Sequence, residues 1–334
     1  MGAQSTLATY NINPSTLTAT KVGSTITVAP PQKSVGVIAA PNDHFIYVFW
    51  CCTTSAERIV VYTTNSLGVP QTPPVQTLSV PIDSGLLVHP SNRFGYSQAF
   101  NSSGSYVRLF QIDPTTGKLS NPKTVATYGP GPYLYGLSST GSKLYDVQFP
   151  GGAYRTYNYR KVDPLTGALG PEVAFFTTQD LTVTLSDKYI AQLNDANEDR
   201  SNLFLDVYAN VVNPSNPLIH CTAAMLDVCH TATAIQFDPS NQYLFIHDGN
   251  LSSSQTIVAR VDATNHQLVA TGASIPGSTT VLFSPDGKLV YEQAGDLSSV
   301  QVYRFNRPSG TLTPGSTVTT QGLNAGGFIP ATWH

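Results

Sequence analysis

The fold is decided by the stretch Val281-Leu282-Phe283-Ser284-Pro285-Asp286-Gly287-Lys288-Leu289-Val290-Tyr291. Apolar residues flank a short polar segment in which proline fixes φ, aspartate hydrogen-bonds its own backbone and glycine accepts a positive φ. This pattern predicts two strands joined by a tight turn. Residues 300–305 follow as a third strand, and Pro308-Ser309-Gly310 turns the chain into a fourth.

The same order of strands and turns recurs at five places upstream. The first turns of the six units fall near positions 41, 90, 139, 187, 239 and 285, so the mean spacing is about 49 residues. Four short strands and their connections fill a unit of this length, as in the blade of a β-propeller. An array of hairpins in a sandwich is the alternative, and the regular period disfavours it.

The two ends of the chain resemble parts of one further unit. The six complete units begin at about residues 35, 84, 133, 181, 232 and 279, which leaves residues 5–30 and 324–334 outside them. Pairing these two segments would close the ring and remove two exposed sheet edges. The sequence therefore predicts an all-β protein, a seven-bladed propeller with four-stranded blades in a single domain over residues 1–334.

The composition excludes several classes of protein. Only 11% of the 334 residues are charged and the net charge is −3, whereas a typical domain is about 25% charged. No run of lysine or arginine occurs, so a nucleic-acid partner is not expected. No stretch is long and apolar enough to predict a membrane span. Met1 is followed by no basic segment and apolar region, so no signal peptide is predicted in this chain.

The turn sequences also indicate a family. Residues 284–291, together with residues 113–119 and 163–169, resemble lactonase-type seven-bladed propellers over essentially the whole chain. These include the bacterial 6-phosphogluconolactonase-like proteins and the fungal carboxymuconate cyclases, which are related to the propellers with Tyr-Val-Thr-Asn repeats. Because turn residues specify a blade and carry no chemistry, the resemblance implies the fold and an expectation of lactone chemistry. It transfers no catalytic residue.

Four residues are candidates for catalysis where the loops after the second strands converge with the loops between blades. His247 and Glu292 follow the second strands of neighbouring blades, His230 lies in the connection entering the first of these blades, and Arg200 lies one blade earlier. A histidine and a carboxylate can activate water against a lactone carbonyl, and an arginine can stabilise the developing oxyanion. The alternative is that all four are ordinary polar residues of the rim.

A second interpretation is a non-catalytic, exported propeller. It would bind a carbohydrate, a peptide or a protein partner, with Trp50, Tyr133 and Phe149 as contact surfaces near the same rim. The enzymatic interpretation instead requires a small lactone or carboxylic acid as substrate and no organic cofactor.

The four cysteines suggest an oxidising compartment. Cys221 and Cys229 are eight positions apart and predict a local disulfide, and the adjacent Cys51 and Cys52 predict a vicinal one. Both bridges fit a secreted or periplasmic protein. Four reduced thiols in a cytosolic protein are the alternative.

An acidic loop suggests one metal site. Asp195, Asn197 and Asp199, with Asp206 further on, have the spacing of a calcium-binding loop. Arg200 stands where such a loop needs glycine, and Asp206 is expected within a strand, so a solvated acidic loop is the alternative reading.

Overall fold

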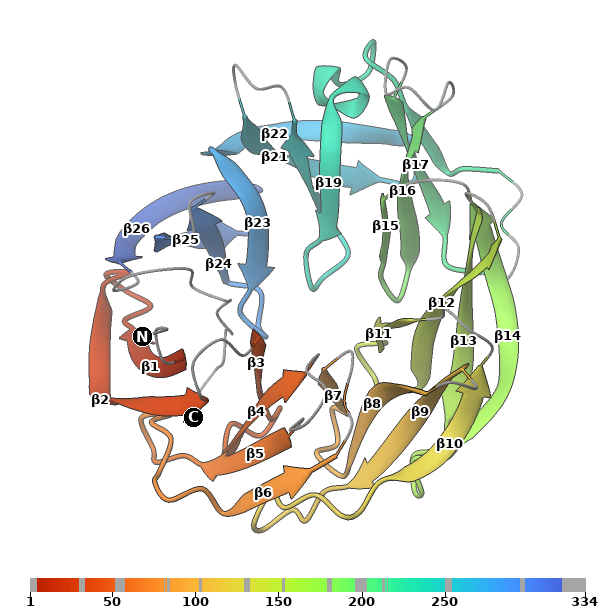
Figure 1. Cartoon of the computed structure of the whole chain (residues 1–334). Helices are drawn as coiled ribbons and strands as arrows, with labels where there is room; N and C mark the ends of the chain where they lie inside the picture. Colours follow the sequence, from red (N-terminus) through yellow and green to blue (C-terminus); the bar gives the residue numbers. More distant parts are fainter. Residues whose placement is uncertain are drawn as a thin grey trace.

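The chain folds into a ring of antiparallel sheets. The computed structural model describes residues 5–29, 34–51, 58–80, 82, 85–101, 104–128, 133–151, 154–178, 182–195, 203–211, 214, 216–249, 254–294 and 298–319. These residues form six four-stranded sheets and one two-stranded sheet. Figure 1 shows the sheets following one another around the ring, with the first strand of each sheet innermost and the last at the perimeter. The fold is an all-β propeller, as the repeat predicts.

The six four-stranded sheets are numbered here as blades 1 to 6 in chain order, and each is an antiparallel meander. Blades 1 to 3 consist of β3 (Ser34–Ala39), β4 (Phe45–Cys51), β5 (Arg58–Thr63) and β6 (Gln76–Ser79); β7 (Leu86–Val88), β8 (Phe94–Asn101), β9 (Gly104–Gln111) and β10 (Lys123–Tyr128); β11 (Tyr133–Leu137), β12 (Lys143–Gly151), β13 (Tyr154–Val162) and β14 (Leu169–Thr178). Blades 4 to 6 consist of β15 (Thr182–Leu185), β16 (Tyr189–Asp195), β17 (Leu203–Ala209) and β18 (Ile219–Cys221); β19 (Ala232–Phe237), β20 (Tyr243–Asp248), β21 (Gln255–Asp262) and β22 (Gln267–Pro276); β23 (Ser278–Phe283), β24 (Leu289–Ala294), β25 (Ser299–Asn306) and β26 (Thr311–Thr319).

The seventh sheet is a hairpin of two strands, β1 (Ser5–Ile12) and β2 (Ala19–Ala29), between blade 6 and blade 1. Val28 packs against Val48 of blade 1, and Ile12 packs against Tyr291 of blade 6. The prediction of seven four-stranded blades is therefore wrong for the described residues, which hold six such blades. The N-terminal segment supplies only two of the four strands that a blade needs, and residues 324–334 lie outside the described residues.

The turns that link third and fourth strands have the chemistry expected from their sequence. In blade 2, Oδ1 of Asp113 accepts the backbone N–H groups of Thr115 and Thr116 at 2.8 and 2.9 Å. These bonds hold the pKa of Asp113 below its ordinary value. Gly117 ends the turn with a φ of +69°, a conformation that costs glycine little.

Buried tyrosines connect the turns of blades 2, 3 and 6 to the preceding blade. The hydroxyl of Tyr47 in blade 1 donates to the carbonyl of Gly117 in blade 2 at 3.1 Å. The hydroxyl of Tyr96 in blade 2 donates in the same way to Gly167 of blade 3 at 2.8 Å. We call these contacts tyrosine struts. Each strut accompanies a close approach of the turn to the preceding blade, since a side chain at Gly117 would collide with the ring of Phe45.

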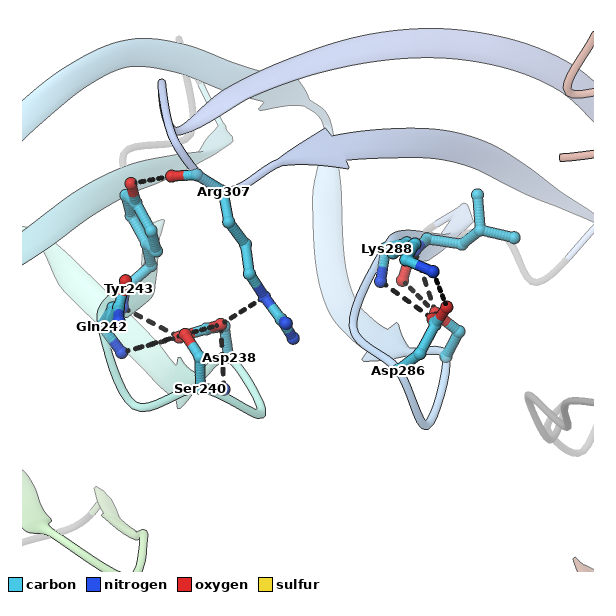
Figure 2. Close-up of polar contacts among 9 residues, drawn as sticks. Asp238, Ser240, Gln242, Tyr243, Asp286, Lys288 and Arg307 are labelled. Carbon is cyan, nitrogen blue, oxygen red and sulfur yellow. Dashed lines mark hydrogen bonds and ion pairs between the residues drawn. The ribbon is translucent and has the colours of Figure 1, made fainter. Parts of the chain in front are cut away.

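The strut between blades 5 and 6 includes a charged contact, shown in Figure 2. The Tyr243 hydroxyl donates to the carbonyl of Arg307, and the Arg307 guanidinium lies 3.4 Å from the buried carboxylate of Asp238. That carboxylate also accepts the backbone N–H groups of Gln242 and Tyr243, each at 2.9 Å. The tight turn of blade 5 is thereby held to the turn of blade 6.

A disulfide closes the loop that connects blades 4 and 5. Cys221 ends β18 and Cys229 lies in the short 3-10 helix η1 (Asp227–His230), and their sulfur atoms are bonded as the sequence predicts. Both cysteines are fully buried in the core shared by the two blades. Closing a loop of this length stabilises a fold by about 2 to 3 kcal/mol. The predicted Cys51–Cys52 bridge lies outside what the structure describes, because Cys52 is not among the described residues. In the described part of the chain, no helix has the length and hydropathy of a membrane span.

Candidate functional site

Polar residues occupy one level of the second strand in four of the six blades. In each blade, the last residue of the first strand pairs with a residue of the second strand, as Phe283 pairs with Val290 in blade 6. The second residue after that pair defines a row, which is Ser97, Asp146, Gln192 and Glu292 in blades 2, 3, 4 and 6. We call it the polar row. All four side chains are buried, and a buried polar group is costly unless it is hydrogen-bonded.

Asp146 in blade 3 is fully provided with partners. Its carboxylate accepts the Tyr128 hydroxyl at 2.9 Å and the Asn158 amide at 3.0 Å. The Arg160 guanidinium lies over the Tyr128 ring and also pairs with Glu172 at 2.7 Å. Burial still raises the pKa of Asp146, and the two hydrogen bonds lower it in part. The hydrogen bonds of Asp146 therefore account for its burial without a functional role.

Opposite the blade 4 member of the row, Gln192, lies a carboxylate bonded to a histidine. Asp206, which pairs with Gln192 across the sheet, accepts the Asn194 amide at 2.8 Å and the Tyr208 hydroxyl at 3.1 Å. Its other oxygen lies 2.7 Å from Nδ1 of His220, whose side chain is half exposed. Asp206 is therefore satisfied by its own blade.

Glu292 in blade 6 differs from the carboxylates of Asp146 and Asp206. Its side chain is 7% exposed, yet among the described residues it has no hydrogen-bond or ion-pair partner. Burial raises the pKa of its carboxyl group, and the Glu292 charge in turn raises the pKa of Tyr303 after the larger effect of burial. A buried carboxyl group without a compensating partner is a frequent mark of a functional site.

His247 faces the same layer between blades 5 and 6 as Glu292. Side chains two residues apart in a strand share a face, so His247 lies on the face of Phe245. Glu292 lies on the face of Val290 and directly opposite Val281. Phe245, Val290 and Val281 all belong to one core cluster between the two blades. The two predicted residues therefore face this layer from its two sides, His247 from blade 5 and Glu292 from blade 6. Each lies two residues along its strand from a member of the apolar core.

The imidazole of His247 is half-buried and held from one side. Its Nδ1 lies 3.4 Å from the hydroxyl of Thr256, a residue that is 3% exposed. Burial lowers the pKa of His247, and the neighbouring charge of Asp248 opposes that shift. The neutral imidazole is thus favoured, which is the form that accepts a proton.

The innermost strands of blades 3, 5 and 6 contain β-bulges, and those of blades 1, 2 and 4 do not. The unopposed residue is Tyr135 in β11, Thr233 in β19 and Thr279 in β23. Bulges re-aim side chains and are common beside active sites. In blade 5 the bulge immediately precedes Ala234, which lies opposite His247. Two of the three bulges therefore belong to the blades that carry His247 and Glu292.

His230 is not brought to this layer. It ends η1, and the neighbouring residues Val228 and Cys229 are buried in the core between blades 4 and 5, on the opposite face of blade 5. Its own side chain is exposed and lies 3.5 Å from Asp227. Arg200, the fourth predicted catalytic residue, lies outside the described residues.

The predicted aromatic contact residues are placed differently. Trp50 in β4 is 6% exposed and packs with Val28 and Val48 where the β1–β2 hairpin meets blade 1, so it presents little surface to a ligand. Tyr133 begins β11 and Phe149 lies in β12. Their side chains are not among those that the structure describes.

The calcium prediction concerns the end of β16. Asp195 is the last residue of that strand, and Asn197 and Asp199 lie outside the described residues. Asp206 lies within β17, as expected, and is bonded to its own blade. In the described part of the chain, no group of three or more His, Cys, Asp and Glu side chains is placed to hold a metal ion.

Two features of the site were missed from the sequence. Thr256 carries no motif and is found only from its position opposite His247 in the neighbouring strand. The bulges at Thr233 and Tyr135 change the register without changing the hydrophobic pattern.

Comparison with known proteins supports the fold. No protein-family model and no curated protein matches the chain. Among solved structures, a Bacteroides uniformis protein suggested to be a 6-phosphogluconolactonase superposes with a TM-score of 0.62 at 16% identity, over 93% of this chain and 92% of its own. An oligogalacturonate lyase in complex with manganese superposes with a TM-score of 0.57 at 12% identity, over 98% of this chain and 89% of its own.

The periplasmic gluconolactonase of Pseudomonas aeruginosa is also similar, with a TM-score of 0.53 at 13% identity over 93% of this chain and 90% of its own. Lactonases and a lyase thus share this architecture, and one fold can host unrelated reactions. At these identities the likeness concerns the fold alone. The chain is a β-propeller whose six described four-stranded blades superpose on these solved propellers.

Proposed function

We propose that this propeller hydrolyses a small lactone between the second strands of blades 5 and 6. The observation that carries the proposal is the buried Glu292 carboxyl group, which faces the same layer as His247. No partner among the described residues accounts for Glu292, whereas Asp146 and Asp206 at the same level are both satisfied. The lactonase-like neighbours supply the reaction class.

The chemistry needs one proton acceptor and one proton donor. Neutral His247 accepts a proton from water as the water oxygen attacks the lactone carbonyl. The ring C–O bond then breaks, and Glu292, whose raised pKa favours its protonated form, gives a proton to the leaving oxygen. Arg200 is the proposed partner of the oxyanion. The product is the open-chain hydroxy acid, and no organic cofactor takes part.

A lactone-hydrolysis screen tests the proposal. The wild type is compared with His247→Ala and Glu292→Gln, and kcat/KM of each variant is expected to fall about 100-fold or more. His220→Ala and Glu172→Gln are matched controls, because they change the same residue types in blades 4 and 3 and should keep wild-type activity. Equal activity in all five proteins would remove both residues from the mechanism and favour a non-catalytic binding propeller.

We also infer that the protein is exported. The support is the buried Cys221–Cys229 disulfide, since such bridges persist in oxidising compartments. Alkylation of the protein in its own cells, followed by mass spectrometry, is expected to leave both cysteines unmodified unless a reductant is added first. Alkylated Cys221 or Cys229 without reductant would contradict export.

A further inference from the structure

Thr256 lies between the histidine of the proposed site and the apolar core of blades 5 and 6. In the sheet of blade 5, Thr256 pairs with His247 in β20 on one side and with Ile275 in β22 on the other. Directly opposed residues of neighbouring strands present their side chains on the same face of a sheet, so all three face blade 6. Ile275 is fully buried in the core cluster that blades 5 and 6 share. Thr256 therefore belongs to the layer that His247 and Glu292 also face.

The hydroxyl of Thr256 is buried and contacts the imidazole of His247. Thr256 is 3% exposed, and its Oγ1 lies 3.4 Å from Nδ1 of the imidazole. Hydrogen bonds of catalytic groups are often this long before a substrate binds. Among the described residues, the structure gives this hydroxyl no other hydrogen-bond partner. Since a buried hydroxyl costs free energy unless it is hydrogen-bonded, the bond to His247 is what offsets the burial of this group.

Titratable groups lie near the imidazole in both blades. Asp248 is the next residue of β20, so its side chain points to the other face of the strand, and its charge opposes the lowering of the His247 pKa by burial. Glu292 and Tyr303 face the layer from blade 6, and burial raises the pKa of both. Thr256 differs from these groups because it is uncharged. A carboxylate in its place would raise the pKa of the imidazole, whereas a hydroxyl can orient the ring and leave it neutral.

We propose that Thr256 is the positioning residue of His247. Its hydroxyl accepts a hydrogen bond from the Nδ1–H group, which leaves the lone pair of the neutral ring on Nε2. Nε2 is then the atom that takes a proton from water as the water oxygen attacks the lactone carbonyl. This role rests on the proposed lactone hydrolysis and adds to it the group that selects the reactive nitrogen. In the opposite arrangement the hydroxyl donates to Nδ1 and Nε2 carries the proton, so neither nitrogen is free to accept a proton from water.

Two substitutions at Thr256 separate orientation of the ring from packing. Thr256→Val removes the hydroxyl and keeps the branched shape, and kcat for lactone hydrolysis is expected to fall about 10-fold while KM changes little. Thr256→Ser keeps the hydroxyl and should retain most of the wild-type kcat. Thr271→Val is the matched control with wild-type kcat, because the Thr271 hydroxyl donates to the Val258 carbonyl of the same blade at 3.0 Å. An unchanged kcat in Thr256→Val, or an equal loss in the valine and serine variants, would overturn the proposal.

The tautomer of His247 can be read without any substrate. Long-range proton–nitrogen correlation spectra of the full chain, with its histidines labelled with nitrogen-15, show which ring nitrogen carries the proton, and a His247→Gln spectrum assigns the signals. At about pH 8, where the imidazole is neutral, we expect the proton on Nδ1 in the wild type and on Nε2, as in free histidine, in Thr256→Val. A wild-type proton on Nε2, or a proton on Nδ1 in both proteins, would overturn the proposal. If Thr256 places the proton on Nδ1 but no lactone is hydrolysed, the proposed reaction fails and the positioning of His247 stands.

Discussion

Ser316 and Leu17 are 299 positions apart in the chain, and they are joined by two hydrogen bonds. The backbone N–H of Ser316 donates to the Leu17 carbonyl at 3.0 Å, and the Ser316 hydroxyl donates to the same oxygen at 2.9 Å. The hydroxyl also accepts the N–H of Ala19 at 2.7 Å. This contact fastens the N-terminal hairpin to the outermost strand of blade 6.

Removing the Ser316 hydroxyl should weaken the contact between the N-terminal hairpin and blade 6. Ser316→Ala removes both side-chain bonds and leaves the Ala19 N–H without its partner, so the free energy of unfolding should fall by about 1 to 2 kcal/mol. Urea denaturation measures the change. Ser309→Ala is the control, because Ser309 is exposed and bonded only within its own turn. A loss no greater than that of the control would show that the contact adds no stability.

Two glycines with a positive φ, Gly117 in a turn and Gly272 within β22, separate the cost of backbone strain from the cost of a steric clash. Gly117→Ala forces alanine into a φ of +69° and places its Cβ 2.4 Å from the Phe45 ring, whereas Gly272→Ala meets a φ of +79° with no atom within 4 Å. We expect losses of about 3 kcal/mol or more at Gly117 and about 1 kcal/mol at Gly272. Thermal or urea unfolding measures both. Equal losses would mean that the Phe45 ring can move to make room for a side chain at Gly117.

Truncation of two members of the polar row should change the free energy of unfolding by very different amounts. Asp146→Ala removes the acceptor of both Tyr128 and Asn158 and should cost about 2 to 4 kcal/mol. Ser97→Ala removes a fully buried hydroxyl that has no hydrogen-bond partner among the residues that the structure describes, so the change in unfolding free energy should stay within about 1 kcal/mol of zero. Denaturant midpoints at one pH compare the two variants. A large loss at Ser97 would reveal a partner for its hydroxyl.

The pH profile of lactone hydrolysis should reflect His247. Burial lowers its pKa from the usual 6.5, and the imidazole acts as a base only when it is neutral. The rate is therefore expected to fall as the pH drops through that lowered pKa, so the acid limb of kcat/KM should lie below pH 6.5. The limb should be absent from the residual activity of His247→Ala. A midpoint above pH 7 would exclude this assignment.

The turn chemistry made most of the fold predictable. Each Asp-Pro-x-Thr-Gly or Ser-Pro-Asp-Gly segment fixes a turn by local backbone bonds, so the period could be read without knowing any long-range contact. The first strands begin at Ser34, Leu86, Tyr133, Thr182, Ala232 and Ser278. Within the described residues, the two-stranded form of the seventh sheet could not be foreseen, because a hairpin and a blade begin with the same pattern.

The candidate site was predictable only in part. Strand alternation leads both His247 and Glu292 to one layer, but whether a buried carboxyl group has a partner depends on neighbours from other strands, as the contrast with Asp146 shows. His230, which the sequence places with His247 and Glu292, lies elsewhere for a structural reason. The disulfide at Cys229 and the buried Val228 hold η1 against the core, and the next side chain is left facing solvent.

The tyrosine struts have a consequence for synthesis on the ribosome. Tyr47 precedes the turn that it holds by 70 positions, and Tyr96 precedes its own by 71. Since the chain emerges from its N-terminus, every blade is made before the turn that will sit on it, and assembly can proceed in step with translation. The bond between Leu17 and Ser316 differs, because it joins the first sheet to the last one and waits for all six blades to be made. A nascent propeller is thus an open arc that grows one blade at a time and becomes a ring only after Ser316 has been made.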